Sequence, residues 1–145
     1  MSARTHSPLG TLRGNFVMLR ADTLRLLLPQ AEVGGAQYLD PATTAQGHDE
    51  GGRILALSSQ MKLLAERPPQ RFVVATLEQG GEGRRWCWDE LRVLIDVELR
   101  PRALPAVLVA SDTPVEHYVE HEGHIAFLCS AHRVNAYALA DGSPA

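Results

Sequence analysis

The sequence is poor in cysteine and carries little excess charge, and these two scarcities exclude several classes of protein. Two cysteines, Cys87 and Cys129, can form at most one disulfide, so the chain is not a disulfide-framed secreted domain. The formal net charge of −3 gives no basic surface for nucleic acid. No apolar run approaches the ~20 residues that a membrane helix needs. We therefore expect neither a nucleic-acid partner nor membrane insertion.

The amino-terminal residues MSARTHSPLG lack the apolar core of a signal peptide, which predicts a cytoplasmic protein. In that compartment two reduced thiols are favoured over a disulfide. The length of 145 residues and the hydrophobic fraction of 45% predict one domain, or two small lobes that share a core. We expect residues 1–12 to form a flexible tail and residues 13–140 to form the domain.

Recognisable catalytic motifs are also missing. The carboxylates of Asp96 and Glu98 have no partner placed by spacing, whereas acid–base catalysis needs a matched pair in a cleft. Ser58 and Ser111 lack the glycines of a nucleophile elbow. The Gly-Gly pairs do not precede the Lys-Ser/Thr of a phosphate loop. The sequence therefore predicts a protein that is not an enzyme and uses no cofactor.

Three histidines, His117, His121 and His124, lie close together in the segment HYVEHEGH. On a helix, two of them and a carboxylate could hold zinc. The neighbouring β-branched residues and Gly123 favour strands instead, and on a strand His117 and His121 would lie about 13 Å apart at ~3.3 Å per residue. We expect a solvated, histidine-rich hairpin and no metal site.

The stretch from Arg71 to Leu104 is the most informative part of the chain. An apolar run at residues 72–75, a glycine-rich turn at 79–83 and the sequence Trp86-Cys87-Trp88 predict a β-hairpin. The two tryptophans share one face. Core packing is the simpler interpretation of them, and an exposed anchor for a partner is the alternative.

Residues 93–99 follow with apolar side chains at every second position. Val93, Ile95, Val97 and Leu99 predict a strand that is half buried on that side. An amphipathic helix through Leu91, Ile95 and Leu99 is the alternative, and the β-branched residues favour the strand.

The rest of the chain predicts further short strands and helices. Strands are predicted at residues 15–19, 24–28, 53–57, 106–110, 115–119 and 124–128, and a long polar, exposed loop is predicted at 34–52. Short helices are predicted at residues 58–66 and 131–139. Many short strands separated by turns predict an all-β barrel or sandwich.

Three segments together resemble the CheW family of chemosensory adaptors: LRLLLPQAEV at residues 24–33, GRILALSSQMKLLA at 52–65 and WCWDELRVLIDVELRPRAL at 86–104. The apolar HIAFLCS at residues 124–130 lies where the family has its later strand. The resemblance implies an all-β fold of two small five-stranded SH3-like β-barrels that share a hydrophobic interior, with short helices.

The resemblance also implies a function: a non-enzymatic adaptor, or scaffold, in a chemotaxis-like or pilus-motility (twitching) signalling array. Such a protein couples a methyl-accepting chemoreceptor to a CheA-like histidine kinase through protein–protein contacts. The partner-binding residues that it implies are Val33 and the group Ser59, Gln60, Met61 and Lys62. The chain departs from the family here, because Ser59-Gln60-Met61 stands where the family has Asp-Leu-Arg. The alternative is a small β-barrel that binds a ligand or metal through its histidines or polar loop.

Overall fold

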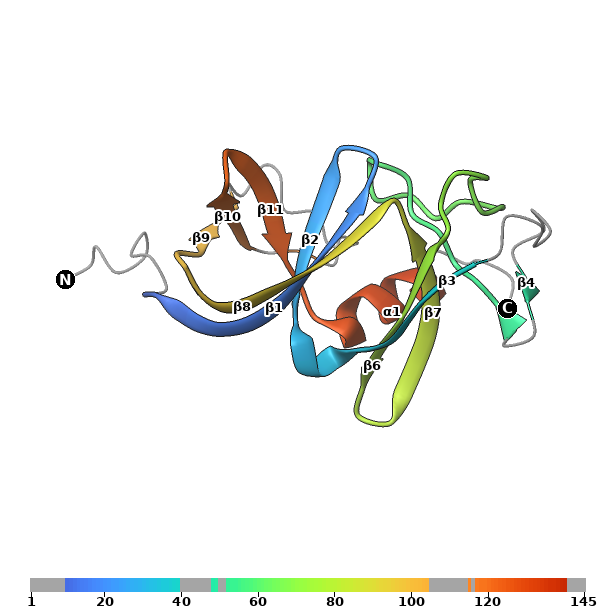
Figure 1. Cartoon of the computed structure of the whole chain (residues 1–145), viewed down its shortest axis with the longest axis horizontal. Coiled ribbons are helices and arrows are strands. Elements are labelled where there is room, and N and C mark those ends of the chain that lie inside the picture. The colour runs from blue at the N-terminus through green and yellow to red at the C-terminus, as the bar shows by residue number, and fades with distance from the viewer. Residues whose placement is uncertain (1–9, 40–47, 50–51, 105–114, 116, 141–145) are drawn as a thin grey trace.

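The computed structural model describes residues 10–39, 48–49, 52–104, 115 and 117–140 (Figure 1). Within these residues strands predominate, and one α-helix lies near the carboxyl end. The elements are β1 (Leu12–Ala21), β2 (Leu24–Pro29), the 3-10 turn η2 (Gln30–Glu32), β3 (Val33–Tyr38), β4 (His48–Asp49), β5 (Gly52–Arg53), β6 (Val73–Gln79), β7 (Glu82–Trp88), β8 (Glu90–Leu99), β9 (Arg102–Ala103), β10 (His117–His121), β11 (His124–Leu128) and α1 (Ala131–Ala140).

The larger sheet has six strands in the order β8-β1-β2-β11-β10-β9. Its neighbours run antiparallel except β11, which pairs with β2 in parallel. The two edge strands, β8 and β9, are consecutive in the chain, with Arg100 and Pro101 between them. The sheet therefore curves back on itself, as Figure 1 shows at the left of the molecule.

The second sheet has three strands in the order β3-β6-β7. The segment that follows β5 adds to its free edge, because the amide of Leu55 donates to the Arg85 carbonyl at 2.8 Å and the amide of Cys87 donates to the Leu55 carbonyl at 2.9 Å. A bridge between Leu57 and Leu63 continues this pairing. The ladders of these sheets do not close into a barrel among the residues described, and β4 and β5 form a separate two-stranded pair.

Short turns produce the hairpins. Gly80 and Gly81 join β6 to β7, and both have positive φ, at 65° and 87°. A two-residue turn with two positive φ angles matches the twist of the strands it connects, and glycine adopts that conformation without steric cost. The glycine-rich sequence thus determines where this hairpin folds.

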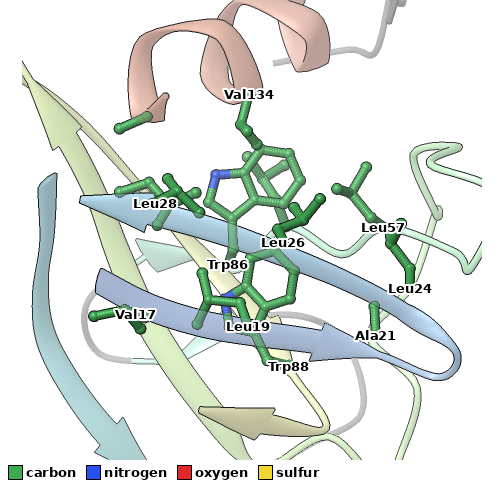
Figure 2. Close-up of a cluster of buried hydrophobic side chains, with 14 of the residues drawn as sticks. Val17, Leu19, Ala21, Leu24, Leu26, Leu28, Leu57, Trp86, Trp88 and Val134 are labelled. Carbon is green, nitrogen blue, oxygen red and sulfur yellow. The ribbon is translucent and has the colours of Figure 1, made fainter. Parts of the chain in front are cut away.

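The central core lies between the two sheets and α1. Every second residue of β1 and β2 contributes, together with both tryptophans and one face of the helix, and Figure 2 shows Val134 of α1 directed at the ring of Trp86. The two indole rings lie 6.5 Å apart and are fully buried. The main members of the central core are Val17, Leu19, Leu24, Leu26, Leu28, Leu57, Leu77, Trp86, Trp88 and Val134.

Two smaller cores lie on the far faces of the sheets. The first-sheet core fills the concave side of the six-stranded sheet and contains Phe16, Met18, Leu27, Leu94, Leu99, Val119 and Ala126. The second-sheet core lies behind the three-stranded sheet and contains Leu39, Ile54, Ala56, Val74 and Cys87. Strands β1 and β2 are therefore buried on both faces, which explains why residues 16–19 and 26–28 are continuously apolar instead of alternating.

Much of the predicted strand pattern is confirmed. The protein is mostly β, the β1–β2 and β6–β7 hairpins form, β11 has the predicted bounds, and α1 lies within one residue of its predicted end. The tryptophans are core residues and not an exposed anchor. The predicted strand at residues 106–110 lies outside the described residues, as does part of the predicted 34–52 loop. No helix in the described part of the chain is long and apolar enough to cross a membrane.

Three predictions are wrong in part. The 34–52 segment is not a loop throughout, because β3 covers Val33–Tyr38 even though its side chains are mostly exposed. Residues 58–66 do not form a helix; a tight turn and the Leu57–Leu63 bridge replace it. In β8, Leu94 is buried while Val93 and Ile95 are exposed, which reverses the predicted face in this half of the strand. Leu99 is buried as predicted. The cause of the reversal is a β-bulge in the pairing of β8 with β1.

Candidate functional site

Four of the five predicted partner-binding residues lie in one turn, formed by residues 58–62 and called here the 58–62 turn. The amide of Met61 donates to the Ser58 carbonyl at 3.0 Å, and the amide of Ser58 donates to the Lys62 carbonyl at 2.8 Å. The Ser58 hydroxyl accepts bonds from the amides of Gln60 and Lys62, each at 3.1 Å. One serine side chain thus satisfies the interior of the turn, which explains why the chain reverses here instead of forming a helix.

Met61 holds the left-handed position of this turn, with φ at 62°. A three-residue hairpin loop usually has glycine at that position, because a side chain there meets the backbone. The Met61 side chain is half buried and packs against the central core. Its neighbours Gln60 and Lys62 are exposed, so the turn presents an amide, one positive charge and the edge of a thioether.

A buried arginine fixes the base of the turn. Arg71 is 1% exposed, and its Nη1 donates to the carbonyl of Leu57, the residue that precedes the turn. Its guanidinium also lies 3.5 Å from the Asp22 carboxylate and 3.4 Å from that of Asp89. The amide of Asp22 in turn donates to Asp89 Oδ2 at 2.6 Å.

The 58–62 turn, the β1–β2 turn and the β7–β8 corner are therefore joined through one guanidinium. Burying this charge is tolerable only because it has two carboxylate partners and a carbonyl acceptor. Removing either carboxylate or the carbonyl would leave the buried guanidinium with fewer groups to stabilise its charge. The turn is in consequence a rigid feature of the surface.

A second buried arginine supports the first. Arg67 Nη1 donates to the Arg71 carbonyl at 2.9 Å, and its guanidinium lies 5.8 Å from the centre of the Phe72 ring. Cys87 lies near both arginines. Burial raises the pKa of its thiol to about 11, although the positive charges of Arg71 and Arg67 oppose the change. The thiol is therefore protonated at neutral pH and is a poor nucleophile.

Cys129 is in a similar state, because burial also raises the pKa of its thiol. Neither cysteine is in a disulfide. The two thiols thus offer no activated sulfur for chemistry at neutral pH.

Val33, the fifth predicted residue, lies elsewhere. It begins β3, pairs with Leu77 of β6 and packs on the central core. In Figure 1 the start of β3 lies at the lower side of the molecule, whereas the segment between β5 and β6 lies at the upper side near the β1–β2 turn. The structure therefore groups Ser59, Gln60, Met61 and Lys62 but does not bring Val33 to them.

The histidines lie on the β10–β11 hairpin. His121 and His124 are cross-strand partners beside the turn, and His117 is opposite Leu128 at the other end. Among the residues described, no three His, Cys, Asp or Glu side chains are placed to share a metal ion. Glu122 instead accepts a bond from Arg92 at 2.7 Å, and this bond holds the pKa of its carboxyl below the usual value.

The Arg71 network was not predicted from the sequence. Its carboxylates belong to Asp22 and Asp89, which are distant in sequence and look like ordinary turn residues. The one available signal was Arg71 itself, a charged residue directly before the apolar run 72–75.

Comparison with known proteins adds no assignment to this geometry. No protein-family model matches the chain, and no curated protein matches it.

Proposed function

We propose that the chain is a non-enzymatic adaptor that acts in the cytoplasm and couples a methyl-accepting chemoreceptor to a CheA-like histidine kinase. In this proposal the domain consists of two five-stranded SH3-like lobes that share the central core. The signalling array controls a chemotaxis-like or pilus-driven motility. The partner-binding surface is the 58–62 turn.

The observation that carries the proposal is the division of the interior into three cores. A single sandwich has one core between two sheets, whereas here each sheet has a further core behind it. The first lobe would consist of β1, β2, β11, β10 and the bent strand β8–β9, wrapped around the first-sheet core. The chain path supports this, since the two edges of the sheet meet at Arg100 and Pro101.

The second lobe would be built around the second-sheet core. Its strands would be β3, β6, β7, the extended residues 54–57 and the short return at 63–64. The bonds from Leu55 and Cys87 attach the fourth strand, and the amide of Leu64 donates to the Ala56 carbonyl at 2.8 Å to attach the fifth. Five strands in each lobe agree with the arrangement that the resemblance implies.

The 58–62 turn suits a contact surface because it is exposed at its tip and rigid at its base. Arg71 fixes its backbone, so little conformational entropy is lost when a partner binds. Met61 and Gln60 offer adaptable apolar and amide contacts, and Lys62 offers a single charge. The affinity of a partner for this surface should therefore depend only weakly on salt concentration.

Co-precipitation with the regulatory domain of a CheA-like kinase and with the cytoplasmic tip of a chemoreceptor tests the proposal. We expect the unaltered chain to capture both partners. Lys62→Ala with Gln60→Ala should weaken capture severalfold without changing the melting temperature. Arg100→Gln, at an exposed arginine of the β8–β9 connection, is the matched control and should bind normally.

Absence of capture with both partners would contradict the adaptor function. Normal capture by the turn variant would leave the adaptor function standing but would exclude the 58–62 turn as its surface. Metal analysis of the dialysed protein addresses the alternative, since a stoichiometric ion would favour the ligand- or metal-binding module.

A further inference from the structure

A hollow of about 480 Å³ lies between the β6–β7 hairpin and the first turns of α1. Its walls come from Gln79 and Arg84 of the hairpin and from His132, Asn135 and Ala136 of the helix, and glycines of the hairpin turn form its lip. This volume is within the range of small-molecule sites and exceeds the space that a few solvent molecules require.

Hydrogen bonds between α1 and the β6–β7 hairpin hold the two walls of the hollow together. Asn135 is 6% exposed; its Oδ1 accepts from Trp86 Nε1 at 2.8 Å and its Nδ2 donates to the Leu77 carbonyl at 2.9 Å. At the start of α1, the amide of His132 donates to Gln79 Oε1 at 3.0 Å. Helix and hairpin are thereby held at a constant separation, so the hollow exists before any ligand enters.

Among the described residues that line the hollow, Arg84 supplies a positive charge. Arg84 extends to the same side of β7 as Trp86, toward α1, and among the residues described its guanidinium makes no ion pair or side-chain hydrogen bond. The His132 imidazole is exposed at the opposite wall and is likewise uncommitted within the described chain. The described residues that line the hollow include no carboxylate.

The helix terminus itself does not provide the site. The amide of Ala131 is already bonded to the Glu32 carboxylate at 2.8 Å, and the amide of Arg133 is bonded to the Ser130 hydroxyl at 3.2 Å. The side chains of Arg84 and His132 therefore remain as donors, and the backbone at Gly81 and Gly83 also lines the hollow. Gly81 and Gly83 have no side chain that would cover this backbone.

We infer that this hollow binds a small organic oxyanion, a carboxylate or a phosphate ester, with Arg84 as the charged anchor and His132 as a second donor. A guanidinium that has no partner among the described residues and faces a preformed cavity is suited to bidentate recognition of either group. This site is separate from the 58–62 turn and does not depend on the adaptor function.

Titration of the full chain with citrate and, separately, with inorganic phosphate at constant ionic strength tests the inference. Amide NMR shifts of Gly81, Gly83 and His132 are the readout, and ethanolamine is the cationic control. We expect saturable shifts with at least one anion and none with ethanolamine. The anion that binds more tightly distinguishes carboxylate from phosphate recognition.

The variants Arg84→Gln and Arg100→Gln remove the same charge, one at the hollow and one at the β8–β9 connection. Arg84→Gln should bind about tenfold more weakly, as expected for loss of a charge-assisted hydrogen bond, and Arg100→Gln should bind like the unaltered chain. Equal binding by the two variants, or shifts that rise linearly without saturation for both anions, would overturn the inference. The kinase co-precipitation is independent of this titration, so either proposal can fail alone.

Discussion

The conformation of Met61 is the most unusual feature at the scale of single residues. It is a half-buried residue in the left-handed region, where a side chain costs roughly 1–2 kcal/mol relative to ordinary backbone. Its contact with the central core opposes this cost. Methionine at this position thus combines an unfavourable backbone with favourable packing.

Comparison of Met61→Gly with Met61→Ala separates these two effects, because both variants lose the side-chain contact. We expect the glycine variant to be more stable than the alanine variant by about 1 kcal/mol in urea unfolding, since only glycine adopts φ near 62° freely. Gln60, whose φ is not positive, is the control. There the alanine variant should be the more stable one, and the same order at both positions would contradict the assigned turn.

Cys87 gives a prediction about pH. Its folded-state pKa of about 11 lies above the ordinary thiol value of 9.0 because the side chain is buried, so the folded protein favours the protonated thiol. The resulting stabilisation is complete below pH 9 and is lost as the pH rises through about 11. Between pH 8 and pH 10.5 the chain should lose about 2 kcal/mol more unfolding free energy than Cys87→Ala does. Urea titrations of the two proteins measure this difference. If both lose the same unfolding free energy over this pH range, the thiol is accessible to water in the folded state.

At the scale of elements, β8 shows how a single residue changes the face of a strand. The register between β1 and β8 shifts between Gly14 and Phe16, and Asp96 adopts a φ of 51° while its amide donates to Asn15 Oδ1 at 2.7 Å. This extra residue inverts the alternation. Leu94 and Leu99, an odd number of positions apart, consequently reach the same core.

Alanine substitution on either side of the bulge tests this account. Leu94→Ala should cost about 2–4 kcal/mol because it empties part of the first-sheet core. Ile95→Ala should cost less than about 1 kcal/mol, since Ile95 is 62% exposed. A larger loss for Ile95→Ala, measured by thermal or urea unfolding, would support the alternation read from the sequence.

The sequence predicted elements whose signals are local. Examples are the glycine turn before β7, the two-residue turn after β1 and the apolar spacing of α1. In each case the residues that predict the element lie within it or directly beside it. The 58–62 turn could not be distinguished from the start of a helix, because the Ser58 side chain can bond backbone amides in both structures. Arg71, which fixes the turn, lies 13 residues after Ser58 in the chain. The edge strand β3 was missed because its exposed side chains leave no alternating pattern.

The candidate site was predicted only in part, for a related reason. Resemblance implied Ser59 to Lys62, which are adjacent in sequence, but it also included Val33, which the fold places in β3 at the opposite edge of the three-stranded sheet. Neither the Arg71 network nor the hollow beside Arg84 leaves a local pattern. Both arise from contacts between segments that are far apart in the chain.

At the scale of the whole molecule, the central core makes the two sheets interdependent. Residues of β1 and β2 share it with the tryptophans of β7 and with Val134 of α1. Loss of either sheet would expose the fully buried Trp86 and Leu26. We expect calorimetry to show one unfolding transition, with a calorimetric enthalpy equal to the van't Hoff enthalpy. Two resolved transitions would mean that the lobes fold independently.

The position of β11 beside β2 has a consequence for synthesis on the ribosome. Strands β1 and β2 are translated before their parallel partner β11 and before the helix that covers the tryptophans, and β3 to β10 lie between them in the chain. Until β11 and α1 emerge, the nascent chain therefore exposes the apolar strands β1 and β2, a state that is prone to aggregate and that chaperones bind. The central core can be completed only after β11 and α1 have left the exit tunnel.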